Sequence, residues 1–300
     1  MARTNDLGAF LLLCLIWGST WLGIKAGLET VPPLVLAGTR FTMAGLILSG
    51  WSLARVRARI IPADVPRLLA AAMLLISLCY GLLFWGMQFI DSGTAAVLEM
   101  GLTPVALLGF ALIFKEEEPS TRRMLAILLG IAGLLVLFGP TARAAWAATN
   151  ASALPRVLGA AAVAAAAIVY GYGSVVSRPL LRRYSPTLIA GTTTLVGGGV
   201  LILVALLFEP GAKRALNFAW GIRAWAGWLF LVIFGSLIGY TLYMRLLRDI
   251  GASRAGMYAF VSPVVALILG AVFEHETITV VKLAGVALLL IAAWLALYRP

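Results

Sequence analysis

An acidic residue and a proline stand within one long apolar stretch of this sequence. Residues 92–114 read SGTAAVLEMGLTPVALLGFALIF, and they include Glu99 and Pro104. An ionised carboxylate facing lipid is costly, so Glu99 must face water, pair with a cation or carry a proton. Arg40 is the candidate cation, and Lys25, near the end of an apolar run, is a poorer one. Three interpretations of Glu99 therefore stay open: a structural ion pair, contact with a substrate ammonium, and proton coupling.

Pro104 has a counterpart in Pro263, which also lies inside an apolar run. Proline lacks an amide hydrogen and clashes with the carbonyl four residues before it. We therefore expect the carbonyls of Met100 and Ala259 to be freed, and each needs a partner from protein, water or ligand. One interpretation is a packing kink satisfied by a neighbouring helix. The other is a pair of hinges that line or gate a cavity, and the matched pair of prolines favours it.

Aromatic side chains recur at helical spacing in the runs that also hold polar residues. Trp17 and Trp21 are four residues apart, and so are Tyr80 and Phe84, so each pair lies on one helix face. The residues predicted to border a central cavity are Trp17, Trp21, Tyr80, Phe84, Gln88, Glu99, Met100, Tyr170, Tyr240, Tyr243 and Tyr258. Tyr172 belongs to the same aromatic set. Ordinary aromatic packing is the alternative for each residue, whereas a cavity with such walls suits a small amphipathic molecule.

The composition places these residues in a membrane. Of 300 residues, 62% are hydrophobic and only 12% are charged, and the mean hydropathy is +1.01; soluble domains carry about 25% charged residues. Apolar runs of roughly 20 residues are long enough to span a bilayer. The predicted spans cover residues 7–28, 33–54, 65–90, 92–114, 122–141, 156–178, 187–208, 224–247, 252–274 and 278–298. The sequence therefore predicts an all-α polytopic membrane protein with ten transmembrane helices.

The basic residues predict the orientation of the helices. The net charge is +11, but the Lys and Arg residues lie in short loops, where they act as orientation signals and contact lipid headgroups. Nucleic acid is therefore not an expected partner. Fifteen of the 23 lie on the side of the two termini, seven lie on the other side, and Arg40 is within a span. Both termini are predicted to be cytoplasmic, in a bacterial inner-membrane protein whose first helix is a retained span and not a cleaved signal peptide.

The chain repeats itself at a nearly constant distance. An offset of 153 pairs Gly18 with Gly171, and an offset of 159 pairs Pro104 with Pro263. Each half holds five spans, so the second half must enter the membrane in the opposite direction. We expect two repeats, residues 1–148 and 149–300, as inverted five-helix units around a central cavity. Inverted repeats recur in transporters, whose substrate site lies near the middle of the bilayer on interrupted helices.

Other classes of function find little support. The sequence has a single histidine, no H-E-x-x-H, no G-x-S-x-G and no G-x-x-x-x-G-K-[ST], so we expect no enzyme, no metal, no cofactor and no ATP site. Cys14 and Cys79 lie in apolar runs, where small core residues are expected. A channel and a lipid flippase remain as alternatives to a carrier, and the oligomeric state, a monomer included, is left open.

The motif residues resemble those of the drug/metabolite transporter superfamily, in its ten-helix duplicated EamA-type family. They are Trp17-Gly18-Ser19, Lys25, Pro33 and Arg40, then Gly251-Ala252-Ser253, Ser262-Pro263-Val264, Glu274 and the region of Gly285. The chain looks most like the bacterial aromatic amino-acid exporters. This resemblance implies export of small amphipathic metabolites such as amino acids by alternating access, with exporters of other metabolites or aromatic cationic drugs and a lipid flippase as alternatives. We expect Lys25 and Arg40 to be structural charges. Thr103 and Ser262 replace an acid that the family often has before these prolines, so no role of that acid carries over.

Overall fold

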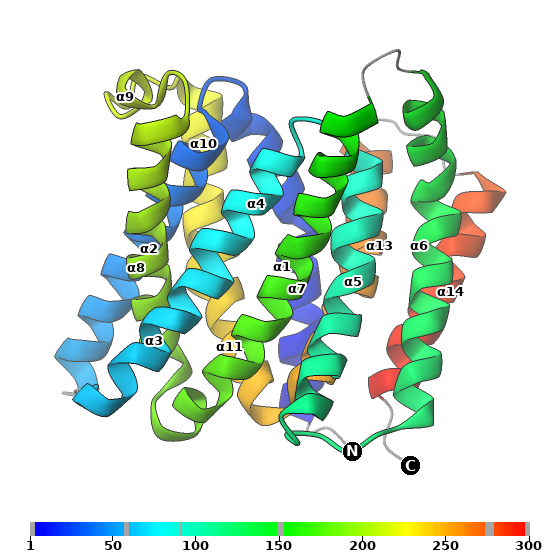
Figure 1. The fold of residues 1–300 in the computed structure, drawn as a ribbon, viewed down its shortest axis with the longest axis horizontal. Helices are drawn as coiled ribbons and strands as arrows, with labels where there is room; N and C mark the ends of the chain where they lie inside the picture. The colour runs from blue at the N-terminus through cyan, green and yellow to red at the C-terminus, as the bar shows by residue number, and fades with distance from the viewer. Residues whose placement is uncertain (1–3, 57–59, 91, 149–152, 274–278, 298–300) are drawn as a thin grey trace.

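The computed structural model describes residues 4–56, 60–90, 92–148, 153–273 and 279–297. In this part of the chain ten helical segments are long and apolar enough to cross a membrane, which confirms the predicted all-α fold. Seven of them are unbroken: α1 (Thr4–Leu28), α2 (Pro33–Val56), α5 (Ser92–Ile113), α6 (Thr121–Ala148), α7 (Ala153–Arg183), α8 (Pro186–Phe208) and α14 (Val280–Leu297). Figure 1 shows the helices as a bundle of near-parallel rods, some in front of others, with both chain ends at the same end of the bundle.

Three spans are composite. The third consists of η1 (Pro62–Asp64), α3 (Val65–Ala72), η2 (Met73–Leu78) and α4 (Cys79–Gly86). The eighth consists of α10 (Ile222–Phe230), η3 (Leu231–Tyr240) and α11 (Thr241–Asp249), after the short α9 (Ala212–Ala215). The ninth consists of α12 (Ala252–Ala255) and α13 (Tyr258–Phe273). The sequence predicted each of these as a single helix, because hydropathy does not detect a local change in helical winding.

The packing of the helices follows the two repeats. α2 packs along α8, and α6 packs along α14, so the second and fifth helices of each repeat pair with their own counterparts. α5 packs on α7, just as α13 packs on α1, so the fourth helix of each repeat contacts the first helix of the other. Every major contact therefore has an inverted counterpart. α6 and α14 form one edge of the bundle (Figure 1) and are the least buried spans, as their lack of polar and aromatic residues in mid-helix predicts.

Two glycines show that the repeat extends to single contacts. A Cβ atom added to Gly18 in α1 would lie 2.5 Å from Cβ of Val265 in α13. A Cβ atom added to Gly171 in α7 would lie 2.6 Å from Cβ of Ala106 in α5. The two glycines differ by the offset of 153, and Val265 and Ala106 differ by 159, the offset that relates the two prolines. The close crossing of α1 with α13 and that of α7 with α5 are therefore equivalent contacts in the two repeats.

The third and eighth spans both contain a π-helical segment. η2 and η3 occupy equivalent places in the two repeats, and residue 73 of η2 corresponds to residue 232 inside η3. A π-helical turn inserts an extra residue and changes the direction of the side chains that follow it, and such turns are common at functional sites. Cys79 and Tyr80 come directly after η2, and Tyr240 ends η3. The widened turns therefore help to set where these three side chains point.

The helix that carries Arg40 begins at a contact between the two halves. The carboxylate of Glu209, just after α8, accepts hydrogen bonds from the backbone N–H groups of Leu34 (2.9 Å) and Val35 (3.0 Å) in the first turn of α2. Partial burial raises the pKa of Glu209, and these two hydrogen bonds act against that rise. At the equivalent start of α8 the hydroxyl of Ser185 accepts from the N–H of Leu188 at 3.2 Å. The start of α2 is therefore capped by a side chain from the other repeat, whereas the start of α8 is capped by a neighbouring residue.

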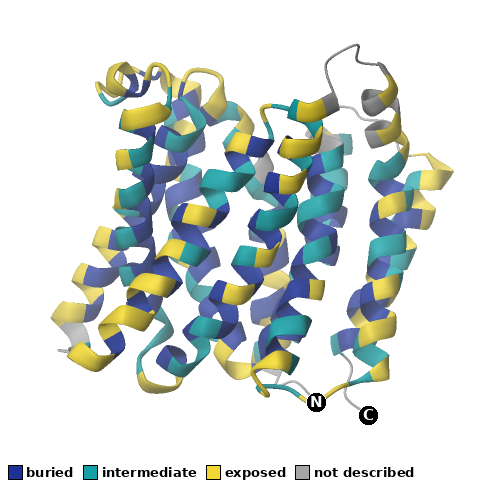
Figure 2. Cartoon of the chain, in the orientation of Figure 1, coloured by how far each residue is buried: buried dark blue, intermediate teal, exposed yellow. Residues whose placement is uncertain are grey.

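The outer surface of the bundle is apolar as well as its interior. Figure 2 shows exposed residues along the outward faces of the helices and buried residues between them. Leu207, Phe208 and Ile113 are each more than 60% exposed. Exposed apolar side chains at this density would aggregate in water, so these faces are the ones that contact lipid.

Candidate functional site

A cavity of about 290 Å³ lies in the centre of the bundle. It is bordered by both repeats, through α1, α2, α4, α5, α7, η3 and α13. Tyr170, Thr103 and Ser262 line it from the middle of their spans. Leu28 ends α1 and Pro33 begins α2, so these two lining residues lie at the end of the bundle opposite the two chain termini (Figure 1). The cavity therefore extends from mid-bundle toward one end only.

The structure brings together most of the residues that the sequence singled out. The cavity is lined by Trp17, Tyr80, Phe84, Gln88, Glu99, Met100, Tyr170, Tyr240 and Tyr258. The side chain of Trp21 lies outside the described part of the structure. These residues come from six different spans, and residue type together with helical spacing had selected them.

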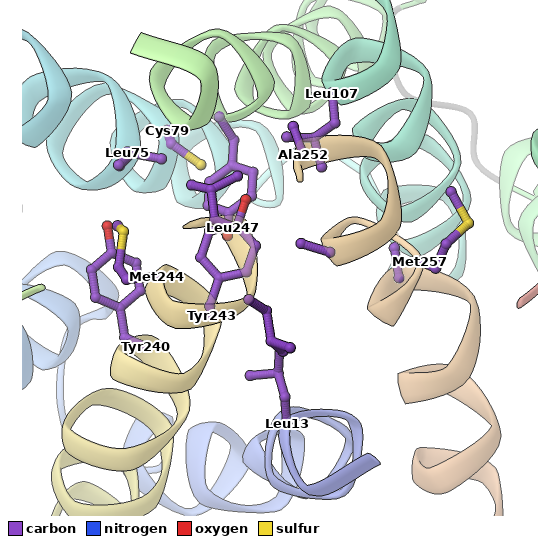
Figure 3. Close-up of a cluster of buried hydrophobic side chains, with 14 of the residues drawn as sticks. Leu13, Leu75, Cys79, Leu107, Tyr240, Tyr243, Met244, Leu247, Ala252 and Met257 are labelled. Atoms are coloured by element: carbon purple, nitrogen blue, oxygen red, sulfur yellow. The ribbon is translucent and has the colours of Figure 1, made fainter. Parts of the chain in front are cut away.

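Tyr243 and Tyr172 lie elsewhere. Tyr243 does not border the cavity but is fully buried behind its wall, with its ring 5.3 Å from that of Trp17 and 5.5 Å from that of Tyr170. Its hydroxyl shares a hydrogen bond of 2.7 Å with that of Ser174. Figure 3 shows Tyr243 inside the cluster of buried side chains, which makes it a support for the cavity wall. Tyr172 is on the opposite face of α7, 37% exposed and stacked on Phe114.

Trp17 is held in place by η3. Its indole N–H donates a hydrogen bond to the carbonyl oxygen of Gly235 at 3.2 Å. A Cβ atom at Gly239 would lie 2.6 Å from the indole nitrogen, so the ring fits only against a glycine. The ring of Tyr258 meets that of Trp17 edge to face at 4.5 Å. The aromatic wall is therefore preorganised by contacts between α1, η3 and α13.

Glu99 lines the cavity without a protein partner. Within the described part of the chain it makes no hydrogen bond and no ion pair, and the ion pair with Arg40 that the sequence allowed is not formed. Arg40 borders the same cavity, and its guanidinium carbon lies 4.3 Å from the ring centre of Phe41 and 5.4 Å from that of Tyr80. Lys25 is exposed in the last turn of α1 and is not among the residues that line the cavity. One acid and one base thus share the cavity without neutralising each other directly.

The two prolines lie beside the cavity. Pro104 is inside α5 and Pro263 is inside α13. Met100 and Ala259, whose carbonyls the prolines leave without a helical donor, both line the cavity. In both repeats the residue four positions before the proline therefore borders this space.

Comparison with known proteins identifies the family. The sequence profile of the EamA-like transporter family matches residues 6–139 and, a second time, residues 157–298. The chain belongs to the EamA-like transporter family. It is 31% identical to the uncharacterized inner membrane transporter YedA of Escherichia coli (strain K12), over 95% of this chain and 88% of YedA.

Other relatives agree with this placement. The uncharacterized transporter YvbV of Bacillus subtilis (strain 168) is 25% identical over 96% of this chain and 89% of its own. Protein PagO of Salmonella typhimurium is 25% identical over 94% and 92%. A solved structure described only as a crystal structure of a protein shares the fold, with a TM-score of 0.80, 21% identity and 99% of both chains covered. This EamA-family protein is therefore a multi-pass membrane transporter and not an enzyme.

The end of the transporter near its termini is closed by paired charges. Glu117 follows α5, pairs with Arg123 at 2.7 Å, and accepts a hydrogen bond from the backbone N–H of Ser253 in α12 at 3.1 Å. Its neighbour Glu116 pairs with Arg178 of α7 at 3.1 Å and also with Arg182. These contacts join the loop after α5 to α7 and α12 below the cavity.

Two further ion pairs lie at the same end. Asp64 binds Arg183 at 3.1 Å and accepts a hydrogen bond from the hydroxyl of Tyr184 at 2.9 Å. Asp6 lies 3.7 Å from Arg245. Sequence reasoning did not select any of these acids. The run KEEEP at residues 115–119 was the available signal, but apart from the nearby Arg123 its partners are more than 60 residues away and were not evident from the sequence.

Proposed function

We propose that this transporter exports small amphipathic metabolites, most of all amino acids including aromatic ones, by alternating access. The observation that supports the proposal is the composition of one cavity: an aromatic wall, together with an acid and a base that form no ion pair within the described part of the chain. An aromatic ring stacks on such a wall, and a zwitterionic head group needs charged or polar partners.

Each part of the cavity has a role in this proposal. The rings of Trp17, Phe84 and Tyr258 cover the apolar part of the substrate. Glu99 binds the substrate ammonium, together with the carbonyl of Met100 that Pro104 leaves free. Pro104 and Pro263 act as hinges, and the inverted repeats supply an equivalent set of contacts for each of the two orientations. A volume of about 290 Å³ suits one small metabolite, since ligand pockets begin at about 300 Å³.

Flux measurements in proteoliposomes test this function. Purified protein is reconstituted and assayed with a panel of labelled amino acids, and we expect saturable, stereoselective flux with aromatic amino acids among the best substrates. Flux without saturation would indicate a channel, and movement of labelled lipid would indicate a flippase. Either result would refute the proposed carrier.

Aromatic cations are the second candidate substrates. Glu99 in an aromatic cavity also suits an organic cation, because a carboxylate and ring faces both attract positive charge. A panel of aromatic amines in the same assay separates the two candidates. Faster flux of the amines than of the amino acids would favour drug export.

The direction of transport depends on the orientation in the membrane. We propose that both termini are cytoplasmic, in the inner membrane of a bacterium, which would make the cavity described here outward-facing. Cysteines placed at Arg3 or Pro300 should stay unlabelled when intact cells are treated with an impermeant maleimide. Labelling from outside would contradict this orientation.

A further inference from the structure

Arg40 is buried in α2 and its charge is only partly compensated. The residue is 5% exposed, and its Nε atom is buried without a hydrogen-bond partner. Within the described part of the chain the guanidinium makes no ion pair. Its guanidinium carbon lies 4.3 Å from the ring centre of Phe41 and 5.4 Å from that of Tyr80. Contact with ring faces does not supply the buried Nε–H with an acceptor.

The arginines at the end of the bundle near the termini differ from Arg40, because they have acidic partners. Arg123, Arg178 and Arg183 each have a carboxylate at 2.7–3.1 Å. A buried cation without such a partner is expensive, because desolvation is not repaid by a counter-charge. Arg40 is therefore the cation whose partner must come from the cavity that it borders.

Two phenol groups in the same cavity are also without partners. The hydroxyls of Tyr170 and Tyr240 are buried and make no hydrogen bond within the described residues, and both residues line the cavity. A phenol and a guanidinium are donors of hydrogen bonds, so both complement an anionic oxygen. Gly235 of η3 adds no side chain beside Arg40, and a Cβ atom there would lie 3.9 Å from Nη1. The cavity thus holds free donors in addition to the free acceptor Glu99.

We propose that Arg40 binds the carboxylate of the substrate and thereby makes this transporter selective for α-amino acids over aromatic amines. The inference rests on the proposed function and assigns the second charge of that site. A zwitterion supplies a carboxylate to Arg40 and an ammonium to Glu99, so each side chain gains a partner of opposite charge. Arg40, Tyr80 and Glu99 all line the same cavity, and the ring of Tyr80 stands against the guanidinium of Arg40, so the two charges border one space.

A purely structural role of Arg40 predicts something different. If the guanidinium only braces α2 against Phe41 and Tyr80, its removal weakens every ligand to a similar extent. If it binds a carboxylate, its removal changes the ratio between ligands that have a carboxylate and ligands that lack one. The ratio is therefore the quantity to measure, because it does not depend on the amount of folded protein.

The test compares L-phenylalanine with its methyl ester, which keeps the ring and the ammonium and lacks the carboxylate. Inhibition of labelled amino-acid flux in proteoliposomes gives an affinity for each compound. Wild-type protein should prefer the acid by about tenfold or more, since hydrogen bonds between charged groups are the strong ones. Arg40→Met should bring the ratio near one, while Arg40→Lys should keep part of the preference.

Two controls complete the design. Glu99→Gln should leave the ratio of acid to ester unchanged, because both compounds carry the ammonium, and should weaken both relative to 3-phenylpropionate. If Arg40→Met does not fold, the wild-type protein is used alone. The rise in its melting temperature with L-phenylalanine is then compared with the rise with the methyl ester. Equal affinity for acid and ester in the wild type, or an unchanged ratio in Arg40→Met, overturns the role of Arg40 and leaves export of aromatic cations intact. Binding of neither compound overturns the proposed function as well.

Discussion

The two ends of the bundle use the same kinds of residue in opposite ways. At the end near the termini, Glu116 and Glu117 have arginine partners, and Glu117 also binds the backbone of α12. In the cavity that reaches the other end, Glu99 and Arg40 face a common space with no ion pair between them. Paired charges hold helices together, whereas unpaired ones are available to a ligand. Pairing, and not residue type, therefore separates a closing contact from a binding group.

The largest effect should come from the acid in the cavity. Glu99→Gln keeps the shape of the side chain but removes the charge that we assign to the substrate ammonium. We expect flux of zwitterionic amino acids to fall by about 10- to 100-fold, since hydrogen bonds to a charged group contribute about 1.5–3 kcal/mol. Flux and melting temperature are measured on the same preparation.

The same variant also tests the two other interpretations of Glu99. A fall in melting temperature with modest loss of flux would indicate a structural role. Loss of the pH dependence of flux would indicate proton coupling. Normal flux with a normal pH profile would show that Glu99 has no role in transport. The difference between the unpaired acid in the cavity and the paired acids near the termini would then have no functional meaning.

Aromatic residues on the two sides of the helices should differ as well. Trp17→Ala removes a ring that borders the cavity and its hydrogen bond to η3, so we expect a fall in flux of about fivefold or more, given about 1 kcal/mol for an aromatic contact. Tyr172→Ala, on the face of α7 away from the cavity, is the matched control and should change flux less than twofold. Equal loss in both, at equal expression, would mean that the rings only pack.

The closed end should loosen when its central acid is neutralised. Glu117→Gln loses the ion pair with Arg123 and weakens the bond to Ser253, at a cost of about 1–3 kcal/mol for a partly buried charge. We expect a lower melting temperature and new access to the cavity from the side of the termini. A small impermeant thiol reagent, applied to inverted vesicles of a Cys14→Ser protein, reports that access through Cys79 in the cavity wall. Unchanged protection of Cys79 would show that Glu117 does not hold this end shut.

The smallest effect should come from an exposed ion pair that neither lines the cavity nor belongs to the ion pairs near the termini. Arg223 and Glu29 are 3.2 Å apart, but their side chains are 76% and 40% exposed. Exposed pairs contribute about 0–1 kcal/mol and are screened by salt. Arg223→Gln should therefore leave flux unchanged and alter the melting temperature by less than the error of the measurement. A large loss of stability would mean that exposure is a poor guide to which pairs matter.

Several features could be predicted from the sequence because they depend on neighbours along the chain. Runs of about 20 apolar residues predict a span whatever surrounds them, so the ten helices followed from hydropathy alone. Spacing of four residues places Tyr80 and Phe84 on one face in any helix. The matched prolines and glycines revealed the repeat, and the closest contacts of Gly18 and Gly171, with the Cβ atoms of Val265 and Ala106, are equivalent in the two halves.

Other features were decided only by the tertiary structure, because they depend on which side chains meet across helices. An acid in one span and a base in another predict an ion pair, yet Glu99 and Arg40 stay apart while Glu116 reaches Arg178, 62 residues along the chain. The face of a helix shows that Tyr243 is turned inward, but only its neighbours place it behind the cavity wall. A π-helical turn depends on a few backbone hydrogen bonds that no pattern of residue types encodes. Which end of the cavity is open is likewise a property of the assembled bundle, since the inverted repeats make both ends alike in design and only their long-range contacts make them differ.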